Sequence, residues 1–222
     1  MVKDTYPMFV TEWFMPESGE VPEPSRTTFL EQVQLPAPQA RGGRPLLEAL
    51  KDRYSCRDFS DRPLSAQQLS DLLWCAFGVN RPATHGRTAP SAQNWQEIAI
   101  YVANAQGLFV FDPTAHALNR LSTTDVRAQT GLQPYAAAAA LDLVYVADFS
   151  RATDATEEER RLYCVADTGF IGQNVYLFCA SEGLATVVRG AIDRPVLATV
   201  LGLSPSQRII LAQSVGYPAD RR

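Results

Sequence analysis

The chain has no two cysteines close enough in sequence to form a zinc-binding or redox motif. Its four cysteines are Cys56, Cys75, Cys164 and Cys179, and no Cys-x-x-Cys pair occurs. Cys75 and Cys179 lie in apolar runs with helical spacing, where a free thiol behaves as a small hydrophobic side chain. We therefore expect no metal site and no disulfide chemistry, and a packing role for these two thiols.

Histidine is also scarce, and no Gly-x-Ser-x-Gly sequence is present. His85 and His116 are the only histidines. Ser91 with one distant histidine does not make a Ser-His-Asp triad, so the pattern argues against a serine hydrolase. His85 lies in the loop 81–87, where it either faces a substrate or is an ordinary surface histidine.

The chain lacks a basic excess, a long apolar run and a signal-peptide pattern. The net charge of −4 and the pI of about 5.2 argue against nucleic acid as the main partner. No uninterrupted apolar run reaches the roughly 18 residues that a membrane-spanning helix needs. We expect a cytoplasmic protein that binds neither nucleic acid nor membrane.

The composition is that of one globular domain preceded by an arm. The chain has 222 residues, of which 46% are hydrophobic and 20% charged, enough for a substantial core. Residues 1–44 are rich in proline, which cannot donate to a regular hydrogen-bond ladder, so we predict an extended arm there. Aromatic residues such as Tyr6, Phe9 and Trp13 indicate that a domain or partner subunit covers the arm. Residues 45–222 form the predicted domain.

Hydrophobic spacing predicts a mixed α and β domain. Helices are expected from Pro45, from Ser65 to Gly78, from Thr156 to Gly183 and after Asp193, with Ser65 and Thr156 as N-caps. Strands are expected at 97–103, 108–111, 139–146, 185–188 and 208–215. Ile98, Ile100 and Val102 alternate on one face of the first strand, which forms a hairpin with the second.

Two arginines flank a serine in Arg53-Tyr54-Ser55-Cys56-Arg57, directly after the first predicted helix. Guanidinium groups match phosphate oxygens in planar, charged hydrogen bonds, and a small hydroxyl between them adds a further donor. The motif therefore indicates a phosphate clamp. The alternative is a solvated basic face or a carbonyl cap at the end of the helix.

A polar loop, Ala89-Pro90-Ser91-Ala92-Gln93-Asn94-Trp95-Gln96, precedes the first long strand. Its amide side chains both donate and accept hydrogen bonds, and its small residues permit close approach, as a flat heteroaromatic ring requires. The alternative is a polar turn that leads into the strand.

In this order, the two motifs resemble the FMN-dependent nitroreductase family, with its Arg-x-Ser-x-Arg/Lys clamp and Pro-Ser-x-x-Asn-x-Gln loop. The resemblance covers about residues 45–218. Other matching segments are 167–169 with 173–174, 182–186, 188–193 and 215–218. The run from Leu72 through Gly78-Val79-Asn80-Arg81 to Ser91 looks most like the SagB/ThcOx-like branch. The resemblance implies an α+β fold with a central, mainly antiparallel sheet flanked by helices, in a domain-swapped type of homodimer.

The resemblance also implies an FMN site between subunits. It assigns the phosphate to Arg53, Ser55 and Arg57, and the ring edge to Pro90, Ser91 and Asn94 of the partner subunit. Arg189 and Gly190 match positions that present a backbone N–H to flavin N5. Many relatives carry Glu where Arg189 stands, so its side chain either points at the ring or faces solvent. Many relatives also have a longer basic tail, and here Arg221 or Arg222 is the candidate to close over the phosphate.

The leading functional prediction is an NAD(P)H-dependent FMN oxidoreductase that reduces nitroaromatics, quinones or other electron-poor acceptors by a ping-pong mechanism. The flavin carries the chemistry, so no protein side chain is expected to be an obligatory acid or base. One alternative is a flavin-dependent dehydrogenase or oxidase that acts on a peptide azoline or another small substrate. Another is a non-catalytic flavin-binding protein.

Overall fold

The computed structural model of the chain describes residues 29–219. Within this range seven strands form one sheet in the order β1-β6-β5-β4-β7-β9-β8, with antiparallel neighbours throughout. They are β1 (Glu31–Gln34), β4 (Ile98–Asn104), β5 (Gly107–Asp112), β6 (Ala117–Ser122), β7 (Leu141–Asp148), β8 (Ala185–Arg189) and β9 (Gln207–Gly216). The α+β class and the mainly antiparallel sheet are confirmed.

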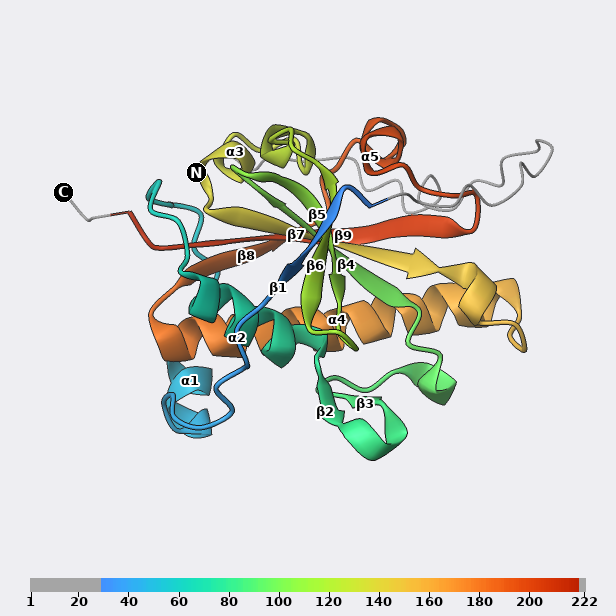
Figure 1. Cartoon of the computed structure of the whole chain (residues 1–222), viewed down its shortest axis with the longest axis horizontal. Coiled ribbons are helices and arrows are strands. Elements are labelled where there is room, and N and C mark those ends of the chain that lie inside the picture. Colours follow the sequence, from blue (N-terminus) through green and yellow to red (C-terminus); the bar gives the residue numbers. More distant parts are fainter. Residues whose placement is uncertain (1–28, 220–222) are drawn as a thin grey trace, which may run out of the picture.

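Helices cover both faces of this sheet. They are α1 (Leu46–Asp52), α2 (Ala66–Phe77), α3 (Tyr135–Ala138), α4 (Glu157–Glu182) and α5 (Arg194–Leu201). In Figure 1, α1, α2 and the long α4 lie on one face, and α3 and α5 lie on the other. A small hairpin of β2 (Val79–Arg81) and β3 (Gly86–Arg87) follows α2 outside the main sheet.

The alternation of side chains along β4 divides the core into two layers. Ile98, Ile100 and Val102 pack with α2 and α4, whereas Tyr101 and Ala103 pack with α5. Successive side chains of a strand point to opposite faces, so one strand supplies both layers. The predicted face of isoleucine and valine is therefore confirmed.

The predicted helix ends are confirmed at the level of single hydrogen bonds. Ser65 and Thr156 each accept a backbone N–H from the third helical residue, and Gln68 and Glu159 complete the two capping boxes. Gly183 ends α4 in the left-handed conformation with a φ of 71°, which glycine adopts without steric cost. These ends fix the length of α4, which positions both halves of the candidate site.

Strand β1 was not predicted, because the surrounding proline-rich segment has little periodicity. Its residues pair with β6, in the register Glu31↔Arg120 to Gln34↔Ala117. Residues 1–28 and 220–222 lie outside the described residues, and with them the aromatic part of the predicted arm and the candidate Arg221.

Within residues 29–219, no helix is long and apolar enough to cross a membrane, and no cluster of His, Cys, Asp and Glu could hold a metal ion. The four cysteines are free thiols. Burial raises the pKa of Cys75 to about 11 and that of Cys179 still further, so both are protonated at neutral pH. The packing role expected for these two thiols agrees with their environment.

Candidate functional site

The segment that follows α1 runs along the free edge of β8. The Cys56 N–H donates to the Thr186 carbonyl at 3.0 Å, and the segment continues to a bridge between Phe59 and Pro218. Strand β8 is the last strand of the sheet, so its outer edge is available to this segment. The predicted clamp therefore lies where a sheet edge, α1 and the second half of α4 meet.

Tyr176 of α4 organises the clamp. Its hydroxyl lies 2.8 Å from Ser55 Oγ and accepts the Val188 N–H at 3.0 Å. The Arg53 guanidinium lies 5.3 Å from the centre of the same ring, a cation–π distance. Arg53 is half-buried, and it makes no ion pair with any residue in 29–219. Its charge is thus positioned but not neutralised.

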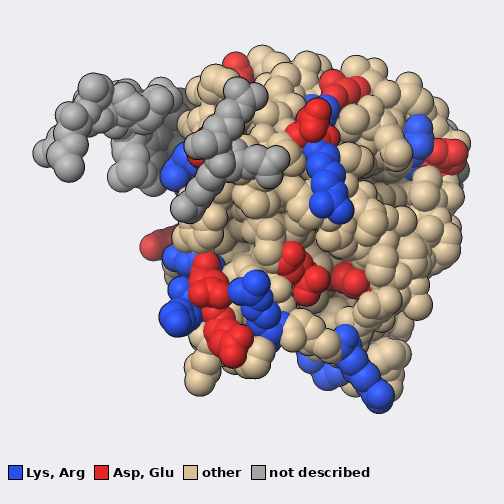
Figure 2. Space-filling view, turned by 90° about the vertical axis from the view of Figure 1, so that its left-hand side faces the viewer, with Lys and Arg blue, Asp and Glu red and all other residues tan. Residues whose placement is uncertain are grey.

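Arg57, the second arginine of the motif, is exposed and forms no ion pair with another described residue. The face that carries α1 and the end of α4 has basic and acidic side chains interspersed, with no broad area of one charge (Figure 2). Positive charge suited to one phosphate is therefore local to the clamp rather than spread over this face.

The edge of β8 remains open beyond Val188. The Thr186 carbonyl and the Val188 N–H point outward, to Cys56 and Tyr176. N–H groups two residues apart along an extended strand point to the same side. The N–H of Gly190, directly after β8, therefore points outward like that of Val188. It has no acceptor within residues 29–219.

The Arg189 side chain lies inside the protein and does not face solvent. Its Nη2 donates to Asp142 Oδ1 at 2.6 Å, and both side chains are completely buried. Further bonds reach Thr130 and Ser214, and Ser214 Oγ also donates to Asp142. Burial raises the pKa of Asp142 to about 6 and the Arg189 charge opposes this shift, so the pair is ionised at neutral pH. The charge of Arg189 is thus neutralised within the sheet.

The polar loop before β4 is held by one buried glutamine. Gln96 donates from its backbone to Ser91 Oγ at 2.8 Å and from its side chain to Asn94 Oδ1 at 3.0 Å. The same side chain donates to the His85 carbonyl and accepts from Arg87 Nε at 2.9 Å. Gln93, Asn94 and Gln96 adopt positive φ angles of 50–56°. This network fixes a strained loop while Pro90 and Asn94 remain exposed.

Two buried carboxyl groups hold this loop, and one of them belongs to α4. Asp167 accepts the Ala92 N–H at 2.8 Å, and Glu97 accepts from Ser91 Oγ at 3.1 Å. Burial raises the pKa of Asp167 to about 6, and the neighbouring Glu97 carboxyl also raises it. The hydrogen bond from the Ala92 N–H lowers this pKa but does not cancel the rise. Asp167 therefore retains a proton at a pH where an exposed aspartate is ionised.

The clamp and the loop do not meet within one chain. Ser55 contacts α4 at Tyr176, whereas Ala92 contacts α4 at Asp167. These helix positions are nine residues apart, about 13 Å along the axis at 1.5 Å per residue. The sequence-predicted residues therefore form two separate groups on the same side of the sheet.

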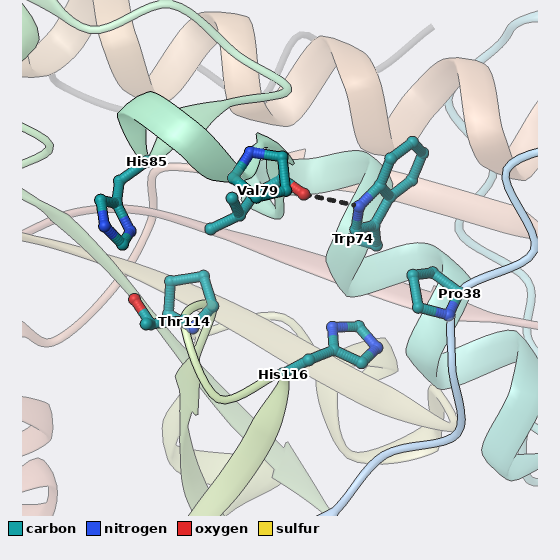
Figure 3. Close-up of a pocket in the computed structure, with 8 residues that line it drawn as sticks. Pro38, Trp74, Val79, His85, Thr114 and His116 are labelled. Atoms are coloured by element: carbon teal, nitrogen blue, oxygen red, sulfur yellow. Dashed lines mark hydrogen bonds between the residues drawn. The ribbon is translucent and has the colours of Figure 1, made fainter.

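Both histidines line a further cavity of about 300 Å³ between the β2–β3 hairpin and the β5–β6 turn. Figure 3 shows His85 and His116 on different sides of it, with Trp74 Nε1 bonded to the Val79 carbonyl. His116 Nε2 lies 2.7 Å from Ser70 Oγ, which donates its proton to the Pro36 carbonyl. His116 must then donate from Nε2, and burial lowers its pKa. This cavity is separate from the clamp.

Two residues that organise the site, Tyr176 and Asp142, were not predicted, and Gln96 was predicted only as part of the polar loop. Tyr176 meets Ser55 only through folding, and no local pattern in α4 distinguishes it. Asp142 is a different case, since a charged residue in an apolar strand is visible in the sequence. A charge within a buried strand requires a partner, which is a signal that could have led to Arg189.

Comparisons with known proteins agree with these features. The family model described as "Nitroreductase family" matches residues 50–217. A protein of Methanocaldococcus jannaschii named "Putative nitroreductase MJ1384" is 30% identical over 156 residues, which are 66% of this chain and 78% of that protein. A solved structure from Ralstonia eutropha JMP134, described as "a putative nitroreductase", is 40% identical with a TM-score of 0.83, and the match covers 93% of this chain and 99% of that one.

A more distant solved structure is the Escherichia coli microcin synthetase McbBCD complex with truncated pro-MccB17. One of its chains is 18% identical with a TM-score of 0.67, and the match covers 99% of this chain and 85% of that one. That likeness shows a shared fold. With the family model matched over most of the domain and the Ralstonia structure matched over almost its whole length, this chain belongs to the nitroreductase family.

Proposed function

We propose that this protein is an FMN-dependent oxidoreductase, with its flavin sites at the interface of a homodimer. When bound, FMN supplies the redox chemistry: it takes a hydride from NAD(P)H and passes electrons to a nitroaromatic, quinone or other electron-poor acceptor in ping-pong order. Family membership supports flavin-dependent oxidoreductase chemistry in general. The observation that carries the proposal is the unneutralised Arg53 beside Ser55, at the open edge of β8.

The residues of this edge fit an FMN molecule. Arg53 and Ser55 would bind the phosphate, because a guanidinium and a hydroxyl form short charge-assisted hydrogen bonds with phosphate oxygens. Arg57 and Arg221 are proposed to supply further positive charge to the phosphate. The free N–H of Gly190 would donate to the ring at N5, and a fixed donor there stabilises added electron density. Arg189 contributes its backbone only, since Asp142 holds its side chain.

The second group of residues would complete the site from the partner subunit. Pro90 and Asn94 are exposed in the single chain, although Gln96 fixes their loop. A preorganised loop with the exposed NH2 group of Asn94 suits the edge of a ring that carries carbonyls and nitrogens. Ser91 would act mainly by holding this loop, because its hydroxyl is engaged with Glu97 and the Gln96 N–H.

Exposed apolar side chains support a dimer. On α4 these are Leu162, Tyr163, Val165 and Phe170, and on the adjacent α1 they are Leu46, Leu47 and Leu50. Exposed large apolar side chains on two helices that pack against each other are typical of an interface. We propose that a second copy of the chain covers this surface. The ring-edge loop is attached to the same helix through Asp167, so a dimer formed here would place the loop of one subunit near the other subunit.

The flavin-dependent dehydrogenase or oxidase that acts on an azoline or another small substrate remains a second candidate. It is motivated by the resemblance of residues 72–91 to the SagB/ThcOx-like branch. The two candidates differ in the electron donor. A reductase consumes NAD(P)H in the presence of an acceptor, whereas an oxidase consumes oxygen with a reduced organic substrate and needs no nicotinamide.

Steady-state kinetics of the FMN-loaded protein test the proposal. NADPH or NADH is varied at several fixed concentrations of menadione and of nitrofurazone, and oxygen uptake is recorded in parallel without these acceptors. Parallel double-reciprocal lines are expected, since the donor leaves before the acceptor binds. Intersecting lines would contradict the ping-pong order, and no nicotinamide consumption with any acceptor would contradict the reductase.

A further inference from the structure

A cavity of about 420 Å³ lies beside the β2–β3 hairpin, at the start of β4 and near the β5–β6 turn. It is separate from the clamp, and its wall combines positive charge with apolar surface. Its lining includes Arg87, Arg151, Asp112, Asn119, Phe29 and Phe77. A volume of this size lies within the range of small-molecule sites.

Arg87 is positioned but incompletely bonded. Its Nε donates to Gln96 at 2.9 Å, and its guanidinium lies 5.5 Å from the centre of the Phe77 ring. Its Nη1 is buried and has no hydrogen-bond partner in the described part of the chain. A buried guanidinium N–H without an acceptor is costly, so proteins seldom leave one unmet. Its Nη2 is not buried and forms no hydrogen bond with a described residue, so this end of the guanidinium is open to an oxyanion in the cavity.

A second positive charge borders the same cavity. Arg151 lies in the turn after β7 and makes no hydrogen bond or ion pair with another residue in 29–219. Burial lowers the pKa of Arg87, and the Arg151 charge lowers it further. Asp112 acts in the opposite direction, but its Oδ1 already accepts the N–H groups of Thr114 and Ala115. Positive charge therefore predominates around the Arg87 guanidinium.

The rest of the cavity favours an organic acid over a bare anion. Asn119 accepts a bond from Gln32 through Oδ1, and its Nδ2 donates to no described residue, so a further donor is available. Phe29 and the start of β4 supply apolar surface. A volume of about 420 Å³ is much larger than an inorganic anion needs. A ligand with an apolar body and one carboxylate would contact both the apolar surface and the arginine side chains of the wall.

We propose that this cavity binds a small aromatic carboxylate, with its carboxylate on the free side of Arg87 and within reach of Arg151. The binding itself does not depend on the flavin assignment. The cavity is nevertheless connected to the flavin-edge loop, because Gln96 accepts from Arg87 and donates to Asn94. A ligand on Arg87 is thus two hydrogen bonds away from a residue proposed to contact the ring.

Isothermal titration calorimetry of the full chain with benzoate tests this proposal. Benzyl alcohol serves as a neutral probe of similar shape, and inorganic phosphate serves as a bare anion. We expect one benzoate site per chain, with benzyl alcohol and phosphate binding at least about 10-fold more weakly. The titration is repeated with saturating FMN, and an unchanged affinity is expected because the cavity is separate from the clamp.

Variants connect the binding to the cavity. Arg87→Gln should weaken benzoate about 10-fold or more. Arg151→Gln should weaken it about 3-fold or more, and since Arg151 bonds to no described residue, this variant should fold normally. Arg44→Gln, on the exposed ion pair with Asp52, is the control and should bind like wild type. Absence of binding, equal affinity for benzyl alcohol, tighter binding of phosphate, competition with FMN, or wild-type affinity in Arg151→Gln would each overturn the proposal.

Discussion

The hydroxyl groups of Ser55 and Tyr176 lie 2.8 Å apart, and this contact joins the predicted phosphate clamp to the long helix α4. Tyr176 accepts the Val188 N–H at the same time, so one hydroxyl sets the distance between the clamp and the edge of β8. Tyr176 is therefore a positioning residue for the proposed phosphate site, although it lies far from the clamp in sequence.

Substitution of Tyr176 by phenylalanine should weaken FMN binding without removing it. The variant keeps the ring under Arg53 and loses the hydroxyl that holds Ser55, so we expect about a 3- to 10-fold higher Kd, corresponding to one ordinary hydrogen bond. Fluorescence quenching of FMN measures the change. Tyr101→Phe, in β4 on the face that packs with α5, is the matched control. Equal affinities in the two variants would show that Tyr176 does not position the clamp.

Removal of the Arg53 charge should have a larger effect. Hydrogen bonds that involve a charged group contribute about 1.5–3 kcal/mol, which corresponds to a 10- to 150-fold rise in the Kd for FMN in Arg53→Ala. Riboflavin, which lacks the phosphate, should bind wild type and variant alike. Arg44→Ala removes a neighbouring exposed arginine and should leave both affinities unchanged. A parallel loss of riboflavin binding would indicate general damage rather than a lost phosphate contact.

The buried ion pair of Arg189 and Asp142 should dominate the stability of its region. Removing one partner leaves the other charge buried and unpaired, so Arg189→Leu is expected to lose about 3–5 kcal/mol in the free energy of unfolding. Urea denaturation measures this loss. The double variant Arg189→Leu, Asp142→Leu should recover a large part of it. If the single variant retains wild-type stability but changes the flavin potential, the side chain acts on the ring instead.

The protonation of Asp167 should make stability depend on pH. Its folded pKa of about 6 lies above the ordinary aspartate value, so its contribution to stability is complete below about pH 4 and is lost as the pH rises through 6. Between pH 4 and pH 6 the free energy of unfolding of wild type should fall by on the order of 2 kcal/mol relative to that of Asp167→Asn. Urea unfolding at pH 4, 5, 6 and 7 measures this difference. The exposed Asp154→Asn is the control, and a difference that does not vary with pH would refute the assignment.

A charge on the exposed face of α4 should separate the proposed dimer. Phe170→Glu places a carboxylate among the exposed apolar side chains of α4, and it should produce a monomer that retains little FMN, because in the proposed dimer the ring-edge loop comes from the other subunit. Light scattering after gel filtration gives the mass. Val196→Glu, an equally exposed site on α5 on the other side of the sheet, should remain dimeric. A Phe170→Glu monomer with full FMN affinity would contradict the shared site.

Local sequence signals predicted most of the fold. The capping boxes at Ser65 and Thr156, the glycine at 183 and the alternation along 98–102 are short-range patterns, and each has a direct physical cause in the structure. Strand β1 escaped prediction because it is only four residues long and forms by pairing with a strand distant in sequence. Such pairing leaves no periodic trace in a proline-rich segment.

The sequence names candidate site residues but not their arrangement. The motifs indicated Arg53, Ser55 and Asn94, yet the separation of clamp and loop by about 13 Å of α4 appears only in three dimensions. Arg189 shows the same limit, because its sequence neighbours do not reveal that Asp142 of β7 lies beside it. A single sequence identifies candidate groups, and tertiary contacts decide which of them remain free to bind.

The visible absorption spectrum of the protein, recorded after incubation with FMN and gel filtration and again after anaerobic addition of NADPH or NADH, tests both the flavin site and the reductase directly. We expect a retained flavin spectrum, near one FMN per chain, that bleaches with a nicotinamide. Retained flavin that no nicotinamide bleaches would contradict the reductase, and a colourless protein would contradict the flavin site itself.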